Sequence, residues 1–473
     1  MKKIFTLSCI LAAALTANAQ EAFKVSPDYL EGEDGQGTVL SLLGENLSTN
    51  NTYVSGQDQE QLIPFVWNVV TGDIKTLIIT DDVKIPIEWD EEGNEIDWTT
   101  EQMTRSGSFH AVSPSGIAVG SVTDQAEYIS YPVMLDATTG KHTYLYREDG
   151  ETGGEGYGIT DDSQTIVGFY FDAAWVTTPC LWTNGGKTRT DLPMPTKEEV
   201  GFPVDYASAR WISPDGNIVL GYVQDFYSGE WVTVTWIRQN DGTYTVDASI
   251  AKNLYQPRPY TEVEGPDGWP VTVYDEITDP KPFIQLEPLC ISDNGEWIMA
   301  VAADYQSEDS SAEFFMASKN IRYNVKTGKY DIIEAGGEGA MIEFFGIAND
   351  GTAVGRYTGA IDWEAMSQPI DAIIWPTGAT SYQKLADHFA DNAYVNGWTA
   401  SALSSISADG KTAMGYASDE MGMQTTFVVE LPALSDGIHR IEASALKGVA
   451  FDLQGRLTNT NGIRIINGKK VIK

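Results

Sequence analysis

The sequence is poor in the residues that most often carry recognisable chemistry. Its 473 residues include three cysteines and four histidines. No two histidines have the spacing of a zinc-binding helix, and no C-x-x-C pair occurs. The G-x-S-x-G elbow, the phosphate-binding loop and the dinucleotide fingerprint are also missing. We therefore interpret His110 and His388 as structural residues and assign no catalytic residue.

Basic residues and long apolar stretches are also scarce. Lys and Arg together number 30 against 67 Asp and Glu, so the formal net charge is −37. Such an acidic chain repels nucleic acid and anionic membranes, and we expect neither as a partner. The acidity indicates solubility, cation binding or a basic partner. No stretch beyond the N-terminus approaches about 18 uninterrupted apolar residues, so we expect no transmembrane span.

The N-terminus has the pattern of an export signal, which we predict at residues 1–19. Lys2 and Lys3 precede an apolar segment from Ile4 to Leu15, and Ala17-Asn18-Ala19 forms a small-x-small cleavage site. The apolar segment is too short to span a membrane. We expect an exported protein, located outside the cell, on the outer-membrane surface or in the periplasm.

What the chain has in abundance is one repeated hairpin. Its clearest copy runs from Trp211 to Gly221, where Ser213-Pro214-Asp215-Gly216 joins two apolar strands in the manner of a type I turn. A lone hairpin is marginal in water, so the copies must pack against one another. Seven copies can be aligned, with starts at Leu47, Val112, Ile159, Ile212, Ile291, Ile347 and Ile406 and small residues eight or nine positions later at Gly56, Gly120, Gly168, Gly221, Ala300, Gly355 and Gly415.

A third strand follows each hairpin and carries a large apolar residue that we assign to the core. These residues are Trp67, Met134, Trp182, Trp236, Tyr323, Trp375 and Phe427. A glycine turn and a short fourth strand usually come next. Four strands per unit, at a spacing of roughly 50 to 60 residues, are typical of propeller blades. We predict an all-β fold, a β-propeller of seven four-stranded blades over residues 20–437, or six if the weak first copy fails. Ala22 to Leu43 would supply a closing strand.

Several copies resemble the HAF-type extracellular repeat. The similarity is carried by Gly158 to Gly168 with Pro179-Cys180-Leu181-Trp182, by Gly346 to Gly355 with Ile374-Trp375, and most closely by Leu385 to Gly415. The resemblance covers roughly residues 45 to 432. It implies a secreted repeat fold and no particular chemistry.

Residues 438–473 differ in charge from the rest of the chain. They hold seven Lys or Arg and two acids, a net charge of +5, which marks a domain boundary. Two short strands are predicted, Gly448 to Arg456 and Gly462 to Lys473. The segment resembles the C-terminal half of the type IX secretion sorting domain, and the resemblance implies a short β-rich tail that contacts the outer-membrane export machinery.

The four strands of a blade, called a to d, predict a functional face. The a–b and c–d turns fall on one face, and the b–c and d–a loops fall on the other. The a–b turns are uniformly tight. The long insertions at 76–106, 251–287 and 381–396 are all d–a connections, and the b–c loops also vary in length. Variation confined to one face of a repeat array favours a binding site there, on what we call the loop face.

An acidic residue recurs on the loop face, four positions after the small residue of strand b. It occurs as Glu60, Asp124, Asp172, Asp225, Asp304 and Asp419. One interpretation is a ring of carboxylates that gathers a cation such as Ca²⁺. The alternative, which we favour, is that each acid caps its own b–c turn by accepting backbone N–H groups. No cofactor or metal is therefore assigned.

Aromatic residues gather in the same loops, and we select four acids and four aromatics as candidate ligand-binding residues beside Asp124. They are Asp172, Trp175, Asp225, Tyr227, Trp231, Asp304, Trp363 and Asp419. Exposed aromatic rings suit stacking on sugar faces or packing against a peptide. The alternative is that the aromatic residues pack between blades.

Cys180 and Cys290 fall at different positions of non-adjacent blades, so we predict two free, buried thiols. Two functions remain open at this stage. The first is a secreted or surface-held recognition module that binds a glycan or a protein. The alternative is a carbohydrate-active hydrolase or lyase that uses loop carboxylates. Acids are so abundant on the loop face that their presence alone does not favour the enzyme.

Overall fold

The computed structural model describes most of the chain in two units, Met1–Pro432 and Ala433–Lys473. The described residues are 23–31, 37–89, 95–225, 229–257, 260–266, 270–274, 281–304, 319–335, 339–364, 366–389, 394–395, 398–419, 421, 423–432, 463–466 and 469–472. The predicted signal peptide lies outside them, as do Tyr227 and the side chain of Asp304. Of the second unit, only the antiparallel strands β36 (Ile463–Ile466) and β37 (Lys469–Ile472) are described.

The first unit is a β-propeller, and its first three blades follow the predicted copies. Each is an antiparallel sheet in chain order. Blade 1 contains β4 (Leu42–Leu47), β5 (Tyr53–Asp58), β6 (Ile63–Asn68) and β7 (Ile74–Thr76). Blade 2 contains β10 (Ser106–Val112), β11 (Ile117–Thr123), β12 (Ser130–Asp136) and β13 (Lys141–Tyr144). Blade 3 contains β14 (Gly153–Ile159), β15 (Ile166–Phe171), β16 (Thr177–Thr183) and β17 (Thr188–Asp191).

Blades 4 to 6 repeat this order. Blade 4 contains β18 (Tyr206–Ile212), β19 (Ile218–Gln224), β20 (Trp231–Arg238) and β21 (Tyr244–Asp247). Blade 5 contains β24 (Phe283–Ile291), β25 (Trp297–Asp304), β26 (Lys319–Asn324) and β27 (Lys329–Ile333). Blade 6 contains β28 (Met341–Ile347), β29 (Ala353–Thr358), β30 (Ile370–Trp375) and β31 (Gln383–Lys384). Blades 4 and 5 join through a single parallel pair, Val232 with Leu286.

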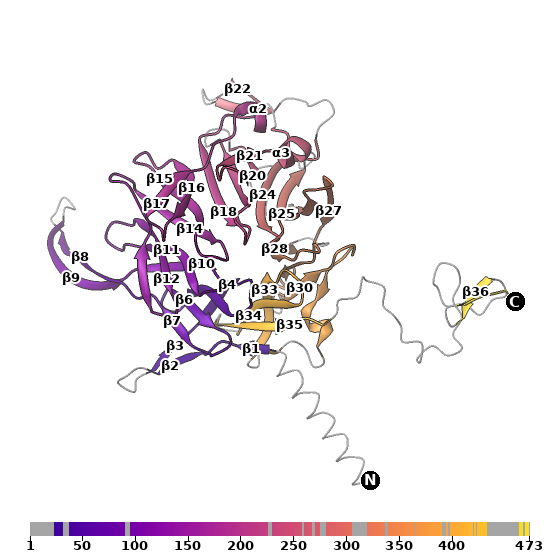
Figure 1. Cartoon of the computed structure of the whole chain (residues 1–473), viewed down its shortest axis with the longest axis horizontal. Helices are drawn as coiled ribbons and strands as arrows, with labels where there is room; N and C mark the ends of the chain where they lie inside the picture. Colours follow the sequence, from indigo (N-terminus) through magenta and orange to yellow (C-terminus); the bar gives the residue numbers. More distant parts are fainter. Residues whose placement is uncertain are drawn as a thin grey trace, which may run out of the picture. The chain divides into compact units, whose positions relative to one another are not determined.

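Blade 7 confirms the predicted closing strand. Its chain-order strands are β33 (Trp398–Ile406), β34 (Thr412–Ser418) and β35 (Gln424–Glu430), and its fourth strand is β1 (Phe23–Val25) from the N-terminus. β1 pairs with β35 so that Phe23 lies opposite Val429. In Figure 1 the colours pass round the propeller from indigo to orange, and the first and last blades lie side by side. The weak first copy therefore does form a blade, and the described chain contains seven.

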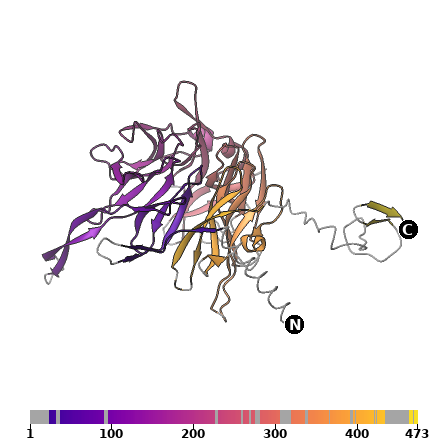
Figure 2. The ribbon, with the colours of Figure 1, turned by 60° about the horizontal axis from the view of Figure 1, so that its bottom comes forward.

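The remaining elements lie between blades. The two-stranded ribbons are β2 (Tyr29–Glu31) with β3 (Gly37–Val39), β8 (Thr80–Trp89) with β9 (Glu95–Thr104), and β22 (Tyr260–Glu264) with β23 (Pro270–Tyr274). The short helices are α2 (Lys197–Val200), α3 (Ser249–Leu254) and the 3-10 turn η1 (Leu385–His388), and β32 (Tyr394–Val395) extends blade 7. The β8–β9 ribbon is the acidic insertion of the sequence. It extends away from the blades in both ribbon views (Figures 1 and 2).

The a–b turns show the chemistry predicted for them. In the clearest copy, Gly216 donates its N–H to the Ser213 carbonyl at 2.8 Å and has a φ of +74°. The Ser213 hydroxyl donates to Asp215 at 2.6 Å and accepts the N–H of Ile218 at 3.0 Å. Ser407 and Asp409 repeat this pair at 2.8 Å. Asp215 and Asp409 therefore act within their own turns.

The large residue of strand c forms the core in nearly every blade. Trp67, Trp182, Trp236, Tyr323, Trp375 and Phe427 are buried, and Met134 is half-buried. Three of the tryptophans also donate their ring N–H to a backbone carbonyl. Trp182, Trp236 and Trp375 donate to Tyr146, Pro193 and Ala379 at 2.9, 2.7 and 2.9 Å. Cys180 and Cys290 are buried free thiols, as predicted. Within the described residues, no helix is long and apolar enough to cross a membrane.

Candidate functional site

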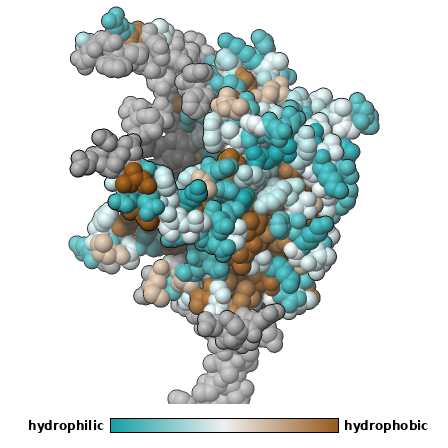
Figure 3. Space-filling model, turned by 90° about the vertical axis from the view of Figure 1, so that its left-hand side faces the viewer, coloured by the Kyte–Doolittle hydropathy of each residue, from teal (hydrophilic) through white to brown (hydrophobic). Residues whose placement is uncertain are grey.

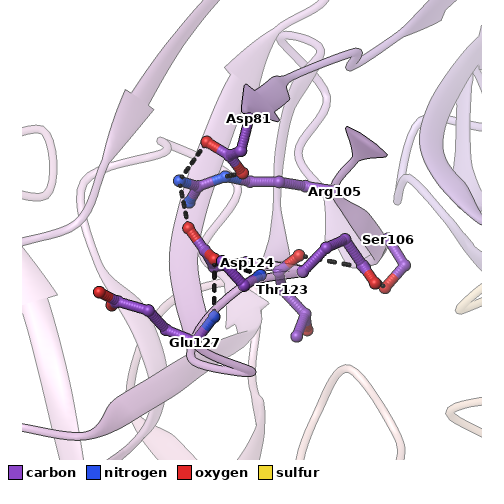
Figure 4. Close-up of polar contacts among 8 residues, drawn as sticks. Asp81, Arg105, Ser106, Thr123, Asp124 and Glu127 are labelled. Atoms are coloured by element: carbon purple, nitrogen blue, oxygen red, sulfur yellow. Dashed lines mark hydrogen bonds and ion pairs between the residues drawn. The ribbon is translucent and has the colours of Figure 1, made fainter. Parts of the chain in front are cut away.

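Asp124, the first loop-face candidate, is held by its own turn and by a neighbouring arginine (Figure 4). Its Oδ1 accepts the N–H groups of Ala126 and Glu127 at 2.8 and 3.0 Å. Its Oδ2 lies 2.9 Å from Arg105 Nη2, and Arg105 also pairs with Asp81 at 2.7 Å. Asp81 belongs to β8, so this cluster fastens the base of the β8–β9 ribbon to blade 2.

The other described acids of the predicted ring also lie at b–c turns. Asp172 Oδ1 accepts the N–H groups of Ala174 and Val176 at 2.7 and 3.0 Å. Asp419 Oδ1 likewise accepts two backbone N–H groups within four residues of itself, at 2.9 and 2.8 Å. Asp225 is buried at the start of its turn. The contacts of Asp124, Asp172 and Asp419 match the capping alternative, whereas in blade 1 Asp58, not Glu60, accepts the backbone N–H, that of Glu60 at 3.1 Å. In the described part of the chain, no group of three His, Cys, Asp or Glu side chains is placed to hold a metal ion.

The aromatic candidates lie on different blades. Trp175 is 59% exposed in the b–c loop of blade 3, and Trp363 is 73% exposed in that of blade 6. Trp231, on β20, is half-buried and contacts Tyr222 with ring centroids 6.2 Å apart. The face seen in Figure 3 is mostly hydrophilic, with hydrophobic residues in a few patches. Binding at the loop face stays a prediction.

A second candidate site lies on the propeller axis, where the a strands of the blades contact one another. A cavity of about 420 Å³ is lined by residues from all seven a strands. Every a strand contains a β-bulge, and the bulged residue lines this cavity. The seven bulged residues are Glu45, His110, Tyr157, Arg210, Leu289, Phe345 and Ser404. We call this space the axial cavity.

The bulges explain the small residue that recurs in strand b. In six blades, a Cβ on that glycine would lie about 2 Å from a carbonyl oxygen of the bulged a strand, as Gly168 would against Glu155 at 1.9 Å. Glycine removes this clash, and the extra residue of the bulge changes the direction of its own side chain. The seventh blade has Ala300 opposite Pro288. The repeated glycine therefore accompanies a side chain that faces the axis.

Glu45, His110 and Tyr157 form the first part of a polar arc along the cavity wall. His110 Nδ1 lies 2.7 Å from Glu45 Oε2, and Ser108 donates to the other Glu45 oxygen. His110 Nε2 lies 3.9 Å from Glu155, and the His110 and Tyr157 rings stack with centroids 4.3 Å apart. Burial lowers the pKa of His110, but Glu45 and Glu155 outweigh it, so the pKa is raised and the imidazolium is favoured.

Arg210 continues the arc on blade 4. Its guanidinium carbon lies 5.1 Å from the ring centroids of both Tyr157 and Tyr222, and its Nη2 donates to the Tyr222 hydroxyl at 3.3 Å. Burial acts to lower the pKa of Arg210, but Tyr222, Tyr157 and Glu287 raise it overall. A planar cation between two rings keeps its charge and its orientation.

Blades 5 to 7 give the cavity a less polar wall. Their bulged residues are Leu289, Phe345 and Ser404. Behind Phe345, Arg356 pairs with Glu343 at 2.9 Å and donates to the Tyr416 hydroxyl at 3.4 Å. One side of the cavity thus offers charged and hydroxyl groups, and the other offers an aromatic and an aliphatic surface.

The a–b turns narrow the end of the axial cavity. Thr49 Oγ1 of blade 1 donates to Asp161 Oδ1 of blade 3 at 2.7 Å, and the Asp161 N–H in turn donates to the Pro214 carbonyl at 3.0 Å. Asp293 of blade 5 also lines the cavity. Burial, and then the charge of Asp161, raise the pKa of Asp293 to about 6. The carboxyl groups of Asp161 and Asp293, from blades 3 and 5, therefore repel each other near this end.

Sequence reasoning missed the axial residues and interpreted His110 as structural. A signal was present in the aligned copies. The first turn residue is Ser or Thr in six copies and Ala348 in the sixth copy along the chain. Three positions before it, the chain has Glu45, His110, Tyr157, Arg210, Leu289, Phe345 and Ser404, while the residue just before the turn is always aliphatic. A position that varies in chemistry between uniform neighbours is typical of a site that differs from blade to blade.

Comparisons with known proteins find distant likenesses among solved structures. No family model matches the sequence, and no curated protein matches it. Among solved structures, hydrazine synthase of Kuenenia stuttgartiensis is 12% identical with a TM-score of 0.43, over 86% of this chain and 100% of that chain. The β-propeller domain of the trilobed protease of Pyrococcus furiosus is 9% identical with a TM-score of 0.42, over 82% and 95%. TolB of Acinetobacter baumannii is 12% identical with a TM-score of 0.35, over 80% of each chain. The chain is a β-propeller, and these likenesses carry no argument about its ligand.

Proposed function

We propose that this protein is an exported recognition module that binds a sugar unit of a glycan in the axial cavity. The observation that carries the proposal is the set of seven bulges, which turns one residue of each blade toward the axis. These seven residues differ in chemistry although the blades share one architecture. A structural role alone does not require such variety.

The size and chemistry of the cavity support a sugar. A volume of about 420 Å³ lies in the range of small-molecule sites, roughly 300–1,000 Å³. Glu45, His110 and Arg210 offer acceptors and donors for hydroxyl groups. Phe345, on the opposite wall, offers an aromatic face for the apolar side of a sugar ring.

The experiment that tests this proposal compares two faces of the same molecule. Protein expressed from Gln20 onward is titrated with a panel of mono- and oligosaccharides in a calorimeter. We expect Phe345→Ala to weaken binding about tenfold or more, corresponding to at least about 1.4 kcal/mol, and Trp363→Ala to leave it unchanged. The reverse pattern would move the site to the loop face. If no glycan binds to the wild-type protein, a protein ligand becomes the better hypothesis.

A carbohydrate-active hydrolase or lyase remains a second candidate because of one contact. Glu45 lies 2.7 Å from His110 Nδ1, an arrangement that orients an imidazole for proton transfer. The test is release of reducing or unsaturated ends from polysaccharides by the same protein. Release that disappears in His110→Ala would establish the enzyme, and retention without release would support the binding module.

The C-terminal tail is proposed to direct export, on the resemblance of residues 438–473 to the type IX sorting domain. Removal of this tail is expected to leave the protein inside the cell envelope of a host that has that export system. Unchanged release into the medium would rule out a sorting role.

A further inference from the structure

Arg210 differs from most of the described arginines of this acidic protein. Within the described residues, Arg105, Arg189, Arg322 and Arg356 each form an ion pair with a carboxylate. No ion pair to Arg210 occurs among the described residues, although Asp and Glu outnumber Lys and Arg by 67 to 30. Arg147 and Arg238 also have no ion pair within the described residues, but neither of them lines the axial cavity. Of the two cationic side chains that line the axial cavity, His110 has Glu45 as its partner. Arg210 is therefore the charged group of the cavity wall that is left to pair with a ligand.

The guanidinium of Arg210 is held in place without being neutralised. The rings of Tyr157 and Tyr222 lie at 5.1 Å from its central carbon, and the Tyr222 hydroxyl occupies Nη2. Its Nε is buried and donates to no group in the described part of the structure. A buried donor without a partner is costly and is usually explained by a ligand, an ion or a water molecule. An arginine fork that is oriented in this way suits a carboxylate, which can accept two parallel N–H bonds.

We propose that Arg210 binds a carboxylate of the ligand, so that the sugar recognised in the axial cavity is an acidic one of the uronic acid class. The proposal rests on the proposed function, because it assigns the chemistry of the ligand in that same cavity. Tyr157 and Tyr222 are positioning residues, since they orient the guanidinium. His110 stacks on the Tyr157 ring and adds a second positive charge when it is protonated.

The surrounding charges limit the ligand to few carboxylates. The charge of Glu155 raises the pKa of His110, and that of Glu287 raises the pKa of Arg210. Asp161 and Asp293 lie near the turn end of the cavity. These carboxylates, together with the net charge of −37, repel any negative charge of the ligand that is not paired with Arg210 or His110. A ligand with one carboxylate at Arg210 is accommodated, whereas a polyuronate would place further charges against these acids. We therefore expect a single acidic sugar, alone or at one position of a glycan.

The test measures the contribution of the carboxylate directly. Protein expressed from Gln20 onward is titrated with matched pairs, glucuronate against glucose and galacturonate against galactose. At least one uronate is expected to bind about tenfold more tightly than its neutral partner, or more, since hydrogen bonds to a charged group have that strength. Arg210→Met is expected to abolish this preference and to leave the affinity for the neutral sugar within about twofold.

Two further variants distinguish a loss of carboxylate binding from a loss of folded protein. Arg210→Lys retains the charge and loses the fork, so it should restore only part of the preference. Arg238→Met removes an exposed arginine of the same blade and should change nothing. Circular dichroism confirms that each variant is folded. In the wild-type protein, the preference for the uronate should also fall as the salt concentration rises.

The outcomes separate this inference from the proposed function. If each uronate and its neutral partner bind equally, and Phe345→Ala weakens both, the cavity binds sugars and the carboxylate assignment is wrong. If a uronate is preferred and Arg210→Met keeps that preference, another residue recognises the carboxylate and the inference is wrong. If the wild-type protein binds neither member of any pair, both the proposed function and this inference are overturned.

Discussion

The acids of the b–c turns and the charged residues of the axial cavity differ in where their hydrogen-bond partners lie in the sequence. Asp172 is satisfied by backbone N–H groups two and four residues away. His110 is held by Glu45, which is 65 residues distant in the sequence and belongs to another blade. The comparison teaches that a recurring polar residue with local partners supports the fold of its own turn. A polar residue whose partners come from other blades belongs to a surface that only the assembled propeller creates.

The largest expected effect comes from filling the space beside a bulge. Gly168→Val would place a Cβ 1.9 Å from the Glu155 carbonyl oxygen, so the bulge that carries Tyr157 must shift. We expect the free energy of unfolding to fall by more than about 3 kcal/mol. Urea unfolding measures it. Gly378→Ala is the control, because its glycine has a φ of +76° and no atom within 4 Å, and it should cost only about 1 kcal/mol. Equal losses in both variants would contradict the bulge argument.

A smaller effect is expected at the loop face, where Asp124 depends on Arg105. Arg105→Met leaves two carboxylates, Asp81 and Asp124, without their shared cation, and both are mostly buried. We expect a loss of about 2 kcal/mol in thermal or urea unfolding and no change in sugar affinity. A loss of affinity without a loss of stability would show that the loop face is the binding site.

The pH dependence of stability tests the environment of the Asp293 carboxyl in the axial cavity. Its raised pKa of about 6 means that the folded state takes up a proton more readily than the unfolded state. The resulting stabilisation is present below the ordinary pKa of 3.8 and is lost as the pH rises through 6. At pH 8 the charge opposes folding, so Asp293→Asn should raise the free energy of unfolding by about 1 kcal/mol, a value discounted for solvent screening.

The gain from Asp293→Asn should be smaller at pH 4, where the carboxyl of the folded protein is protonated. Denaturant unfolding at the two pH values measures the difference. A gain that does not depend on pH would show that the substitution acts through packing. Asp409→Asn is a matched control at another a–b turn, since hydrogen bonds from Ser407 and Lys411 hold the pKa of Asp409 below its usual value and substitution should not stabilise the protein at pH 8.

The smallest effect is expected for Trp363→Ala. Its side chain is 73% exposed, so its removal should change the free energy of unfolding by less than about 0.5 kcal/mol. If the site is axial, sugar affinity is unchanged as well. A clear loss of affinity at constant stability would favour the aromatic residues of the loop face as the ligand-binding surface.

Much of the fold could be predicted because the information is local. The turn at Ser213 to Gly216 closes its own hairpin with hydrogen bonds between residues at most five apart. The buried residue of strand c, such as Trp236, recurs at one place in each repeat. Counting such repeats predicts seven blades, or six without the weak first copy, and the structure shows seven. It also confirms the closing strand predicted in the N-terminal segment.

The site could not be predicted in the same way. Glu45, His110, Tyr157 and Arg210 are spread over 166 residues and come from four blades. The recurring acids of the b–c turns were easier to find because they repeat, and repetition reports what all blades share. A residue that varies from copy to copy was harder to recognise as part of one wall.

The sequence by itself determined the hairpins, the blade core and a ring of six or seven blades, since turn chemistry and alternating burial are specified by neighbouring residues. Only the tertiary structure decided which residue each bulge turns toward the axis and which charges then meet. The physical reason is that a bulge depends on the pairing of two strands, and the cavity depends on the closure of the whole ring. A single repeat contains its own bulge, but no single repeat contains the closed cavity.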